Sequence, residues 1–308
     1  MTTVVVFGGS GFLGRRLVRR LAGDGLNVRV AVRHPASARS ILNAAGLDRV
    51  MVQRADVCDQ AMVAAAIAGA DAVVNAVSAY VERGGATFEA VHVRGAEMVA
   101  REAAAAGVAR LVLVSGIGAD SDSRSPYIRA RGRGECAVQR EFPGATIVRP
   151  SAMFGPGDAL FGTMADLARL SPMLPLMGAG LTRLQPVYVE DVAEAVARML
   201  ADPVTASRTY ENTGPNVYTL RELVGITLRL IGRRRLLVPV PFAIVDVLAR
   251  LFELLPSPPL TTGQVDLLRM DNVASGTLPR LQDLNIQPKG VEEVVPSYIG
   301  RPHASESD

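Results

Sequence analysis

Apolar and polar positions alternate along the first 150 residues on two length scales. Short apolar runs, which predict strands, occur at Thr3–Phe7, Asn27–Val32, Val50–Arg54, Ala72–Asn75, Arg110–Val114 and Ala145–Val148. Amphipathic segments long enough for helices separate them at 12–23, 36–45, 59–68, 86–106 and 126–141. Short β-branched runs between helix-length segments are typical of βαβ units, which build a parallel sheet covered on both faces. The pattern therefore predicts a doubly wound α/β fold.

The pattern changes after Pro150. Residues 151–189 are rich in Pro, Gly and Met and contain few strong strand patterns. Helical patterns and proline-punctuated apolar runs follow at 190–200, 219–231 and 236–260. We therefore predict a Rossmann domain at 1–150, a smaller and mostly helical lobe at 151–299 that is interleaved with the sheet edge, and a disordered polar tail at 300–308.

Composition supports a folded globular chain. Of the 308 residues, 49% are hydrophobic, and the 33 Lys and Arg residues are mixed with 30 Asp and Glu residues, which excludes global disorder. Nearly all of the cations are arginines, because Lys289 is the only lysine. The net charge is +3, the basic residues are scattered and the sequence contains no nucleic-acid recognition motif, so we expect no nucleic-acid partner.

Cysteine and histidine usage argues against disulfides and metal sites. Cys58 and Cys136 are too few and too far apart for a disulfide framework, and the three histidines form no metal-binding motif. The N-terminal run MTTVVVFGGSGFLG lacks the basic region of a secretion signal, and no uncharged stretch reaches the roughly 18–20 residues that span a bilayer. We therefore expect a cytoplasmic protein without a metal cofactor.

A glycine-rich turn follows the first predicted strand directly. The run Gly8-Gly9-Ser10-Gly11-Phe12-Leu13-Gly14 has the spacing G-x-x-G-x-x-G and opens a predicted helix. Gly8 would permit a tight turn, Gly11 a close approach of the backbone to a pyrophosphate, and Gly14 close packing of the helix on the strand. The first helical N–H groups would face the phosphates. The motif therefore predicts a dinucleotide site that includes Gly8, Ser10, Gly11, Phe12, Leu13 and Gly14.

The end of the second predicted strand indicates which dinucleotide binds. An Asp or Glu about 20 residues after the glycine turn usually holds the ribose of NAD(H). Here the strand ends in Arg33-His34, without an acid. The Arg33 guanidinium could bind a 2′-phosphate through two hydrogen bonds, with Arg15 or Arg16 nearby. The alternative is that Arg33 is an ordinary solvated residue, but the pattern favours NADP(H) over NAD(H).

Two further strand ends fit the same site. Asp56-Val57 follows the third strand, where an adenine amino group would need an acceptor, and Asn75-Ala76-Val77 follows the fourth, where small residues would border the ribose and pyrophosphate. Either segment alone could be ordinary loop chemistry. Because ligands of open α/β sheets bind at the carboxyl ends of the strands, we assign Asp56, Val57, Asn75, Ala76 and Val77 to the site.

These motifs and several later ones resemble a known superfamily. The later motifs are Tyr127 in SPYIRARGRGE, Arg149-Pro150-Ser151, Phe154-Gly155-Pro156-Gly157, the run QPVYVEDVA at 185–193 and Asp271-Asn272-Val273. Over about residues 1–295 the chain resembles an extended or atypical short-chain dehydrogenase/reductase. Within that superfamily it is similar to the branch that includes the nucleotide-binding accessory subunit of respiratory complex I and its bacterial relatives. The resemblance implies that Tyr127, Arg131 and Pro150 border the cofactor.

The resemblance also implies a catalytic pair that departs from the superfamily pattern. Active members use Tyr-x-x-x-Lys, in which the tyrosine exchanges a proton with the substrate and the lysine binds the ribose and relays protons. This chain has Tyr127 and Arg131, which share one helix face at i and i+4. Arginine can bind ribose hydroxyls and favour a phenolate, but it cannot relay a proton by losing one.

The catalytic hydroxyl at the end of the fifth strand also departs from the pattern. The superfamily commonly places a Ser or Thr where this chain has Ile117. Ser115 could substitute for it, or could be an ordinary hydrogen-bonded serine at a strand end. With Arg131 and Ile117 both altered, we expect a nucleotide site with weakened chemistry, and we assign the catalytic positions to Tyr127, Arg131 and Ser115.

An apolar segment with a basic lead-in occurs at 233–255. Three arginines, Arg233 to Arg235, precede a helical pattern from Phe242 to Leu255 that is too charged to span a membrane and unusually apolar for an exposed helix. One interpretation is a helix that rests on a membrane surface or on a respiratory-complex partner. The other is a helix buried in the core of the second lobe.

Two functional hypotheses follow. The first is an NADP(H)-binding accessory or assembly protein of quinone-dependent respiration, cytoplasmic and peripheral at the inner face of the membrane. The second is an active NADP-dependent oxidoreductase that acts on a quinone, sugar or lipid-like carbonyl. The altered Arg131 and Ile117 favour the first hypothesis, and the intact glycine turn with Tyr127 favours the second.

Overall fold

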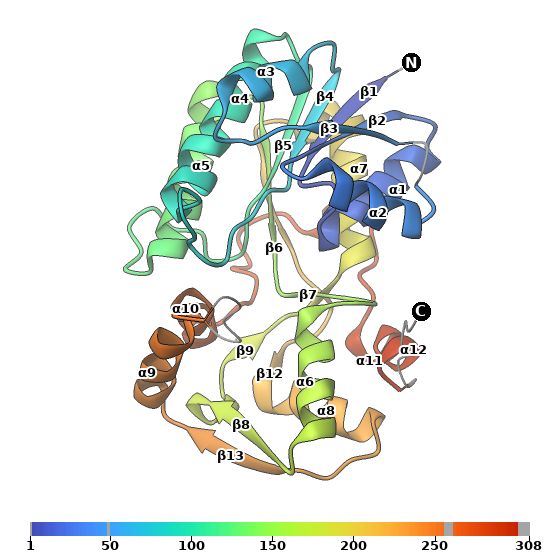
Figure 1. Cartoon of the computed structure of the whole chain (residues 1–308). Helices are drawn as coiled ribbons and strands as arrows, with labels where there is room; N and C mark the ends of the chain where they lie inside the picture. The colour runs from blue at the N-terminus through green and yellow to red at the C-terminus, as the bar shows by residue number, and fades with distance from the viewer. Residues whose placement is uncertain (1, 48–49, 256–260, 301–308) are drawn as a thin grey trace. The chain divides into compact units, whose positions relative to one another are not determined.

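A seven-stranded sheet forms the centre of the N-terminal unit. The computed structural model describes residues 2–47, 50–255 and 261–300 (Figure 1). The strands lie in the order β11-β6-β5-β4-β1-β2-β3, and each neighbouring pair is parallel. Their bounds are β1 Thr3–Phe7, β2 Asn27–Val32, β3 Met51–Arg54, β4 Ala72–Asn75, β5 Arg110–Val114, β6 Thr146–Pro150 and β11 Thr209–Asn212.

Helices cover both faces of this sheet (Figure 1). On one face lie α3 Gln60–Ile67, the π-helix η1 Glu89–Gly95, α4 Ala96–Ala105 and α5 Pro126–Glu141; on the other lie α1 Phe12–Gly23, α2 Pro35–Ala44 and α7 Val189–Ala201. Short 3₁₀ helices occur at η3 Pro203–Thr205 and η4 Leu281–Leu284. The α3–α5 face packs on strand side chains such as Val5, Val73 and Leu111, all nearly inaccessible to solvent. The predicted doubly wound parallel sheet is confirmed.

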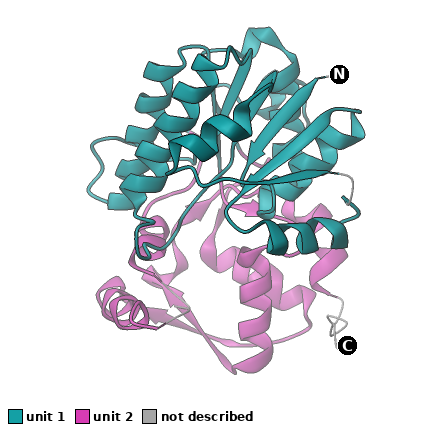
Figure 2. Cartoon of the chain, turned by 45° about the horizontal axis from the view of Figure 1, so that its top comes forward, with its two compact units in different colours: residues 1–150, 189–212, 275–287 teal, residues 151–188, 213–274, 288–308 magenta. Residues whose placement is uncertain are grey.

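The chain forms two compact units, and each draws on several segments (Figure 2). The first contains residues 1–150, 189–212 and 275–287, and the second contains 151–188, 213–274 and 288–308. Residues 189–212 and 275–287, within the lobe expected to be interleaved with the sheet edge, group with the first unit. The strand β11 carries the short, half-polar sequence TYEN, which lacks the β-branched signature that identified the first six strands.

The returning segment is joined to the first unit by backbone and charge contacts. Strand β11 extends the sheet beside β6, with Thr209 opposite Ile147. On α7, Glu194 accepts a hydrogen bond from Arg20 Nε of α1 at 2.5 Å, and Arg198 Nη1 donates to the carbonyl oxygen of Leu284 at 2.7 Å. These contacts explain why α7 and β11 fold with the sheet.

The second unit is smaller and mixes short helices with two-stranded sheets. Its helices are α6 Ala159–Leu170, η2 Gly178–Gly180, α8 Leu220–Leu230, α9 Phe242–Phe252, α10 Thr262–Arg269, α11 Val291–Val294 and α12 Pro296–Ile299. Its strands are β7 Met153–Phe154, β8 Met173–Met177, β9 Arg183–Leu184, β10 Val187–Tyr188, β12 Tyr218–Thr219 and β13 Leu236–Val240. Buried side chains such as Phe154, Phe161 and Leu223 form its core. Of the predicted tail, residues 301–308 lie outside the described residues.

None of the described helices has the length and apolar character needed to cross a bilayer.

A backbone contact in the first unit depends on one glycine of α5. A Cβ atom added to Gly134 would lie 1.9 Å from the carbonyl oxygen of His92, in the π-helix η1. Any side chain at this position would therefore force the two helices apart. This close approach also fixes the position of η1 beside α5.

We expect Gly134→Ala to lower the free energy of unfolding by about 2–3 kcal/mol, because the new methyl group overpacks a backbone contact. The matched control is Gly23→Ala in α1, where an added Cβ has nothing within 4 Å. That control should be neutral or stabilising by up to about 1 kcal/mol, since alanine favours helix. Chemical denaturation measures both, and equal effects would contradict the packing argument.

Candidate functional site

The glycine-rich turn closes tightly against β4 and α1. Gly8 has φ +78°, in the region that favours glycine, and a Cβ there would lie 2.8 Å from the carbonyl oxygen of Ala76. A Cβ on Gly14 would lie 2.2 Å from the carbonyl oxygen of Gly8. The turn therefore requires glycine at both positions, as the sequence motif indicates.

The first turn of α1 is built to receive an anion. Its N-cap is Gly11, which makes no side-chain capping hydrogen bond, and the first turn carries no acidic residue. The first N–H groups of a helix lack partners within the helix, so those of Phe12, Leu13 and Gly14 are left for a ligand. Ser10 is partly exposed beside them. This cradle fits a pyrophosphate.

Basic side chains lie at the carboxyl end of β2. Arg33 and His34 are both exposed, and α2 begins at the next residue. Burial raises the pKa of the Cys58 thiol and Asp56 adds to the increase, whereas Arg94 of η1 and Arg33 oppose it. Arg16, by contrast, is buried and engaged: its Nη1 donates to the carbonyl oxygen of Phe12, and its Nε lies 3.6 Å from Glu190.

Two of the other predicted strand-end residues, Asp56 and Asn75, accept hydrogen bonds from backbone N–H groups of their own turns. Asp56 Oδ1 accepts a hydrogen bond from the N–H of Cys58 at 3.0 Å, and Asn75 Oδ1 accepts one from the N–H of Val77 at 3.2 Å. Val57 is buried, and a Cβ on Gly95 would lie 2.8 Å from its Cγ2. These residues therefore shape the turns in addition to any contact with a ligand.

Tyr127 and Arg131 are joined by a short hydrogen bond. Arg131 Nε donates to Tyr127 Oη at 2.7 Å, and Arg131 Nη2 donates to Ser78 Oγ at 2.8 Å. The guanidinium also lies over the phenol ring, 5.0 Å from its centroid. Gly116 lies beside it, because a Cβ there would make an ordinary contact with Arg131 Nη1 at 3.5 Å. The two predicted catalytic residues therefore form one buried unit.

Three aromatic rings enclose the phenol of Tyr127, which is only 3% exposed. The ring of Tyr80 stacks on it at 5.6 Å between centroids. Phe88 and His92 meet it edge-on at 5.4 and 5.5 Å. A carbonyl substrate could reach the hydroxyl only after one of these rings moves.

Burial and the Arg131 charge set the protonation of this cluster. Burial raises the pKa of Tyr127 to about 12, although the nearby Arg131 opposes the shift. Burial, reinforced by Arg131, lowers the pKa of His92 to about 4. His92 Nε2 lies 2.9 Å from the carbonyl oxygen of Ala79 and 3.3 Å from its nitrogen. The shorter contact favours a neutral ring that donates from Nε2 and keeps Nδ1 as an acceptor.

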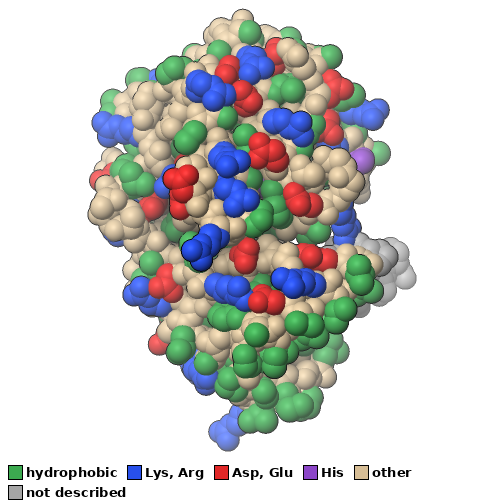
Figure 3. Space-filling model, turned by 90° about the vertical axis from the view of Figure 1, so that its left-hand side faces the viewer, with side chains coloured by type: hydrophobic (Ala, Val, Ile, Leu, Met, Phe, Trp, Pro, Cys, Tyr) green, Lys and Arg blue, Asp and Glu red, His purple; other side chains and the backbone are tan. Residues whose placement is uncertain are grey.

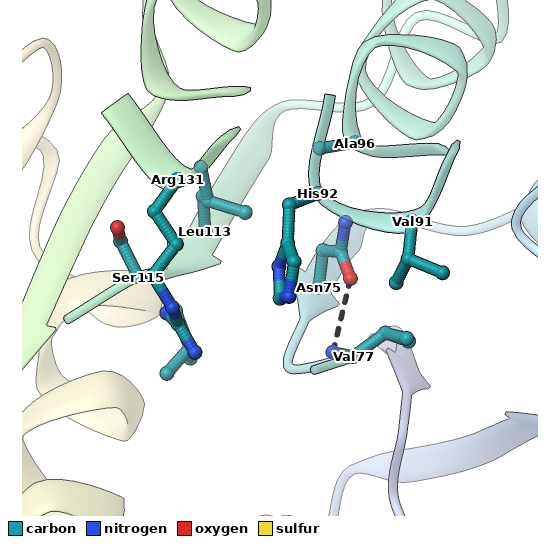
Figure 4. Close-up of a pocket in the computed structure, with 9 residues that line it drawn as sticks. Asn75, Val77, Val91, His92, Ala96, Leu113, Ser115 and Arg131 are labelled. Atoms are coloured by element: carbon teal, nitrogen blue, oxygen red, sulfur yellow. Dashed lines mark hydrogen bonds between the residues drawn. The ribbon is translucent and has the colours of Figure 1, made fainter. Parts of the chain in front are cut away.

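A small pocket lies beside Arg131 (Figure 4). Figure 4 shows the imidazole of His92 between Arg131 and Asn75. Residues that line the pocket are Asn75, Val77, Val91, His92, Ala96, Leu113, Val114, Ser115 and Arg131. Ser115 is 6% exposed, and its Oγ has no hydrogen-bond partner among the described residues. Its hydroxyl is therefore available to a ligand, which the alternative of a hydrogen-bonded strand-end serine would not allow.

Ile117, two residues after Ser115, has a structural role. The Ile117 side chain is buried, and its N–H donates to the carbonyl oxygen of Pro150 at 3.1 Å. This hydrogen bond links the segment after β5 to Pro150, the last residue of β6. Ile117 itself supplies no hydroxyl.

Sequence reasoning missed four residues that contact Tyr127 or Arg131. Ser78, Tyr80 and Phe88 lie in or next to the loop after β4, and His92 lies in η1. A loop offers no periodic signal that places its side chains against a helix far along the sequence. His92 alone had a usable signal, because a histidine among apolar residues of a predicted helix invites a test for burial.

Comparison with known protein sequences identifies a family. The profile of the NAD dependent epimerase/dehydratase family matches residues 4–211. The chain is 35% identical, over 92% of its length and 73% of the other, to NADH dehydrogenase [ubiquinone] 1 alpha subcomplex subunit 9, mitochondrial, of Arabidopsis thaliana. It is 33% identical, over 77% of its length and 73% of the other, to ceramide reductase of Caulobacter vibrioides.

Solved structures share the fold. A dTDP-glucose 4,6-dehydratase from Streptomyces venezuelae, with NAD and TYD bound, superimposes with a TM-score of 0.75 at 23% identity, over 97% of this chain and 96% of that chain. The UDP-glucose 4-epimerase of Thermus thermophilus, in complex with NAD, gives a TM-score of 0.71 at 20% identity, over 97% and 98%. At these identities the likeness establishes the fold alone.

The low pKa of His92 predicts a pH dependence of stability. Between about pH 6.5 and pH 4 the unfolded chain binds a proton on this imidazole that the folded chain does not, so folding should weaken as pH falls through this window. The contribution should be fully present above pH 6.5 and reach about 3 kcal/mol.

Chemical denaturation of wild type and His92→Gln at pH 7 and pH 4.5 measures this contribution, because the carboxylates are common to both proteins. Wild type should lose more stability on acidification than the variant. His34→Gln, at an exposed position, is the control and should behave as wild type. The same loss in all three proteins would contradict a neutral, buried His92.

Proposed function

Because the chain belongs to the NAD dependent epimerase/dehydratase family, within the extended short-chain dehydrogenases/reductases, we propose that it is an NADP(H)-binding accessory or assembly protein of quinone-dependent respiration. The buried Tyr127–Arg131 unit carries this proposal: it keeps the architecture of a catalytic pair but replaces its proton-relaying member with arginine. The identity with subunits named for mitochondrial NADH dehydrogenase supports the respiratory context.

The basic edge beside β2 supports a preference for NADP(H). Arg33 is exposed where an acid would bind the ribose of NAD(H). A 2′-phosphate would gain charge-assisted hydrogen bonds there. The 2′-hydroxyl of NAD(H) would lack its usual carboxylate acceptor, because neither Arg33 nor His34 is an acid. The Gly8–Gly14 turn would hold the pyrophosphate of either dinucleotide.

Two features support weakened chemistry. Arg131 remains protonated at any physiological pH, so Tyr127 cannot be reprotonated through it. The Tyr80 ring stacks on the phenol, so substrate access requires that ring to move. A bound dinucleotide would thus serve mainly as a structural or sensing ligand.

The second candidate is an active NADP-dependent reductase of a quinone, sugar or lipid-like carbonyl. The unpartnered hydroxyl of Ser115 beside Arg131 favours it, because these two groups could bind a carbonyl oxygen while Tyr127 donates a proton to it. NADPH, when bound, would supply the hydride. Arg131 would stabilise the resulting phenolate through the Nε–Oη hydrogen bond. The identity with a ceramide reductase supports a lipid-like substrate.

The proposed location is the cytoplasmic side of the inner membrane, with the chain bound peripherally. The segment 233–255 supports this location, because it combines the exposed Arg233 and Arg234 before β13 with a helix, α9, that has exposed apolar side chains. A respiratory-complex partner would meet the same segment.

Cofactor preference is tested first. NADPH should bind at least about tenfold more tightly than NADH, since a phosphate–guanidinium contact contributes about 1.5–3 kcal/mol. Arg33→Ala should erase the difference, and Arg39→Ala, an exposed arginine on α2, should preserve it. Isothermal titration calorimetry of the three proteins with both nucleotides measures six affinities, and equal affinities in wild type would refute the NADP(H) assignment.

Turnover distinguishes the two functions. With quinones, nucleotide sugars or long-chain ketones, NADPH oxidation by wild type should be slow. Arg131→Lys should raise it about tenfold or more, because lysine restores a group that can lose a proton. Arg133→Lys, exposed on the same helix, is the control and should change nothing. Fast wild-type turnover that disappears in Tyr127→Phe would instead establish the reductase.

A further inference from the structure

Exposed apolar side chains are concentrated in the second unit. Among the described residues, 18 large hydrophobic side chains are exposed, and 14 of them belong to this unit. The first unit, although larger, has only Ile41, Met51, Tyr80 and Val204. Scattered exposed apolar residues are normal, but a concentration in one part of a protein marks a binding surface.

Helix α9 exposes many apolar side chains, which is unusual for a helix that faces water. It buries Val245 and Ala249 against Val265, and Phe242 packs on this cluster. Its exposed apolar residues are Ile244, Val247, Leu248 and Leu251. Val247 is 55% exposed and Leu251 57% exposed. The interpretation of 233–255 as a buried helix therefore holds for one narrow stripe only. Phe252 is half-buried, so the outward face depends on Leu251 and its neighbours.

The strand pair that leads into α9 also exposes apolar side chains. In the pairing of β8 with β13, Met173 lies opposite Leu236, and the two are 52% and 63% exposed. Strand β13 leads into α9, and Val240 and Met177 at the ends of the two strands pack against the α9 core. Figure 3 shows hydrophobic side chains gathered at the lower end of this face of the molecule.

Charges around this surface are mainly positive. Arg233, Arg234 and Arg250 are exposed, and no ion pair engages them within the described part of the chain. The two acids of α9 and its C-cap are engaged: Asp246 accepts a hydrogen bond from Arg269 at 2.5 Å, and Glu253 accepts one from the N–H of Thr262 at 2.8 Å. The surface thus combines apolar side chains with free cations.

We infer that this surface docks on an anionic lipid bilayer. We call it the α9 face and define it by Met173, Leu236, Val247, Leu248, Leu251 and Leu254. Its leucines would enter the boundary between head groups and acyl chains, and the arginines would contact lipid phosphates. A second copy of the chain fits less well, because symmetric pairing would bring these arginine clusters together. The inference rests on the proposed peripheral location and adds the surface that produces it.

Vesicle sedimentation tests the docking. The full chain should bind vesicles of phosphatidylglycerol and phosphatidylcholine mixed in equal parts at least tenfold more tightly than pure phosphatidylcholine vesicles. Salt should weaken binding to the mixed vesicles, because cation–phosphate attraction is screened beyond about 8–10 Å. Leu248→Ser/Leu251→Ser should reduce binding at least tenfold, and Arg233→Gln/Arg234→Gln should remove the preference for anionic lipid.

Controls separate docking from folding and from the nucleotide site. Val204→Ser, at an exposed position of the first unit, should bind vesicles as wild type does. Every variant should keep the wild-type melting temperature and NADPH affinity. NADPH binding without vesicle binding would overturn the docking alone, and vesicle binding without NADPH binding would overturn the nucleotide assignment alone.

Two other results would overturn the lipid inference. A double leucine variant that unfolds at lower temperature would show that these side chains belong to the core. The second is a wild-type protein that does not bind vesicles but dimerises as its concentration rises. If the double leucine variant abolished that dimerisation, the α9 face would be assigned to a second copy of the chain.

Discussion

A buried positive charge constrains the whole candidate site. The guanidinium of Arg131 is 9% exposed, and no carboxylate among the described residues lies within ion-pair distance of it. It is stabilised instead by neutral oxygens, those of Tyr127 and Ser78, and by the π face of the phenol. A second positive charge beside it is disfavoured. Burial, reinforced by this charge, keeps His92 neutral, whereas burial keeps the Tyr127 phenol protonated even though Arg131 opposes that shift.

Much of this arrangement could be predicted from the sequence because it depends on local order. The i, i+4 spacing alone places Arg131 beside Tyr127, and the turn from Gly8 to Gly14 is a contiguous motif. The partners Ser78 and His92 come from other elements, so only the folded chain reveals them. The same distinction holds for the fold. Runs of β-branched residues predicted six strands of the sheet, but β11 has no such run.

Helix α9 shows a second limit of sequence reasoning. Apolar residues surround most of its circumference, so periodicity could not tell which stripe the protein covers. In the folded chain, tertiary packing buries Val245 and Ala249 and leaves Leu248 and Leu251 exposed to solvent. The two units thus depart from ordinary burial in opposite ways. The first unit buries the charge of Arg131, and the second unit leaves apolar side chains exposed to water.

The late arrival of β11 affects how the protein is made. A ribosome completes β6 at Pro150 but must add more than fifty residues, mostly of the second unit, before Asn212 can emerge. Until then Ile147 and Val148 lie on an open strand edge, which can pair with other chains. A nascent or truncated chain that stops at the first apparent boundary is therefore prone to aggregate, and chaperones have most to protect during this interval.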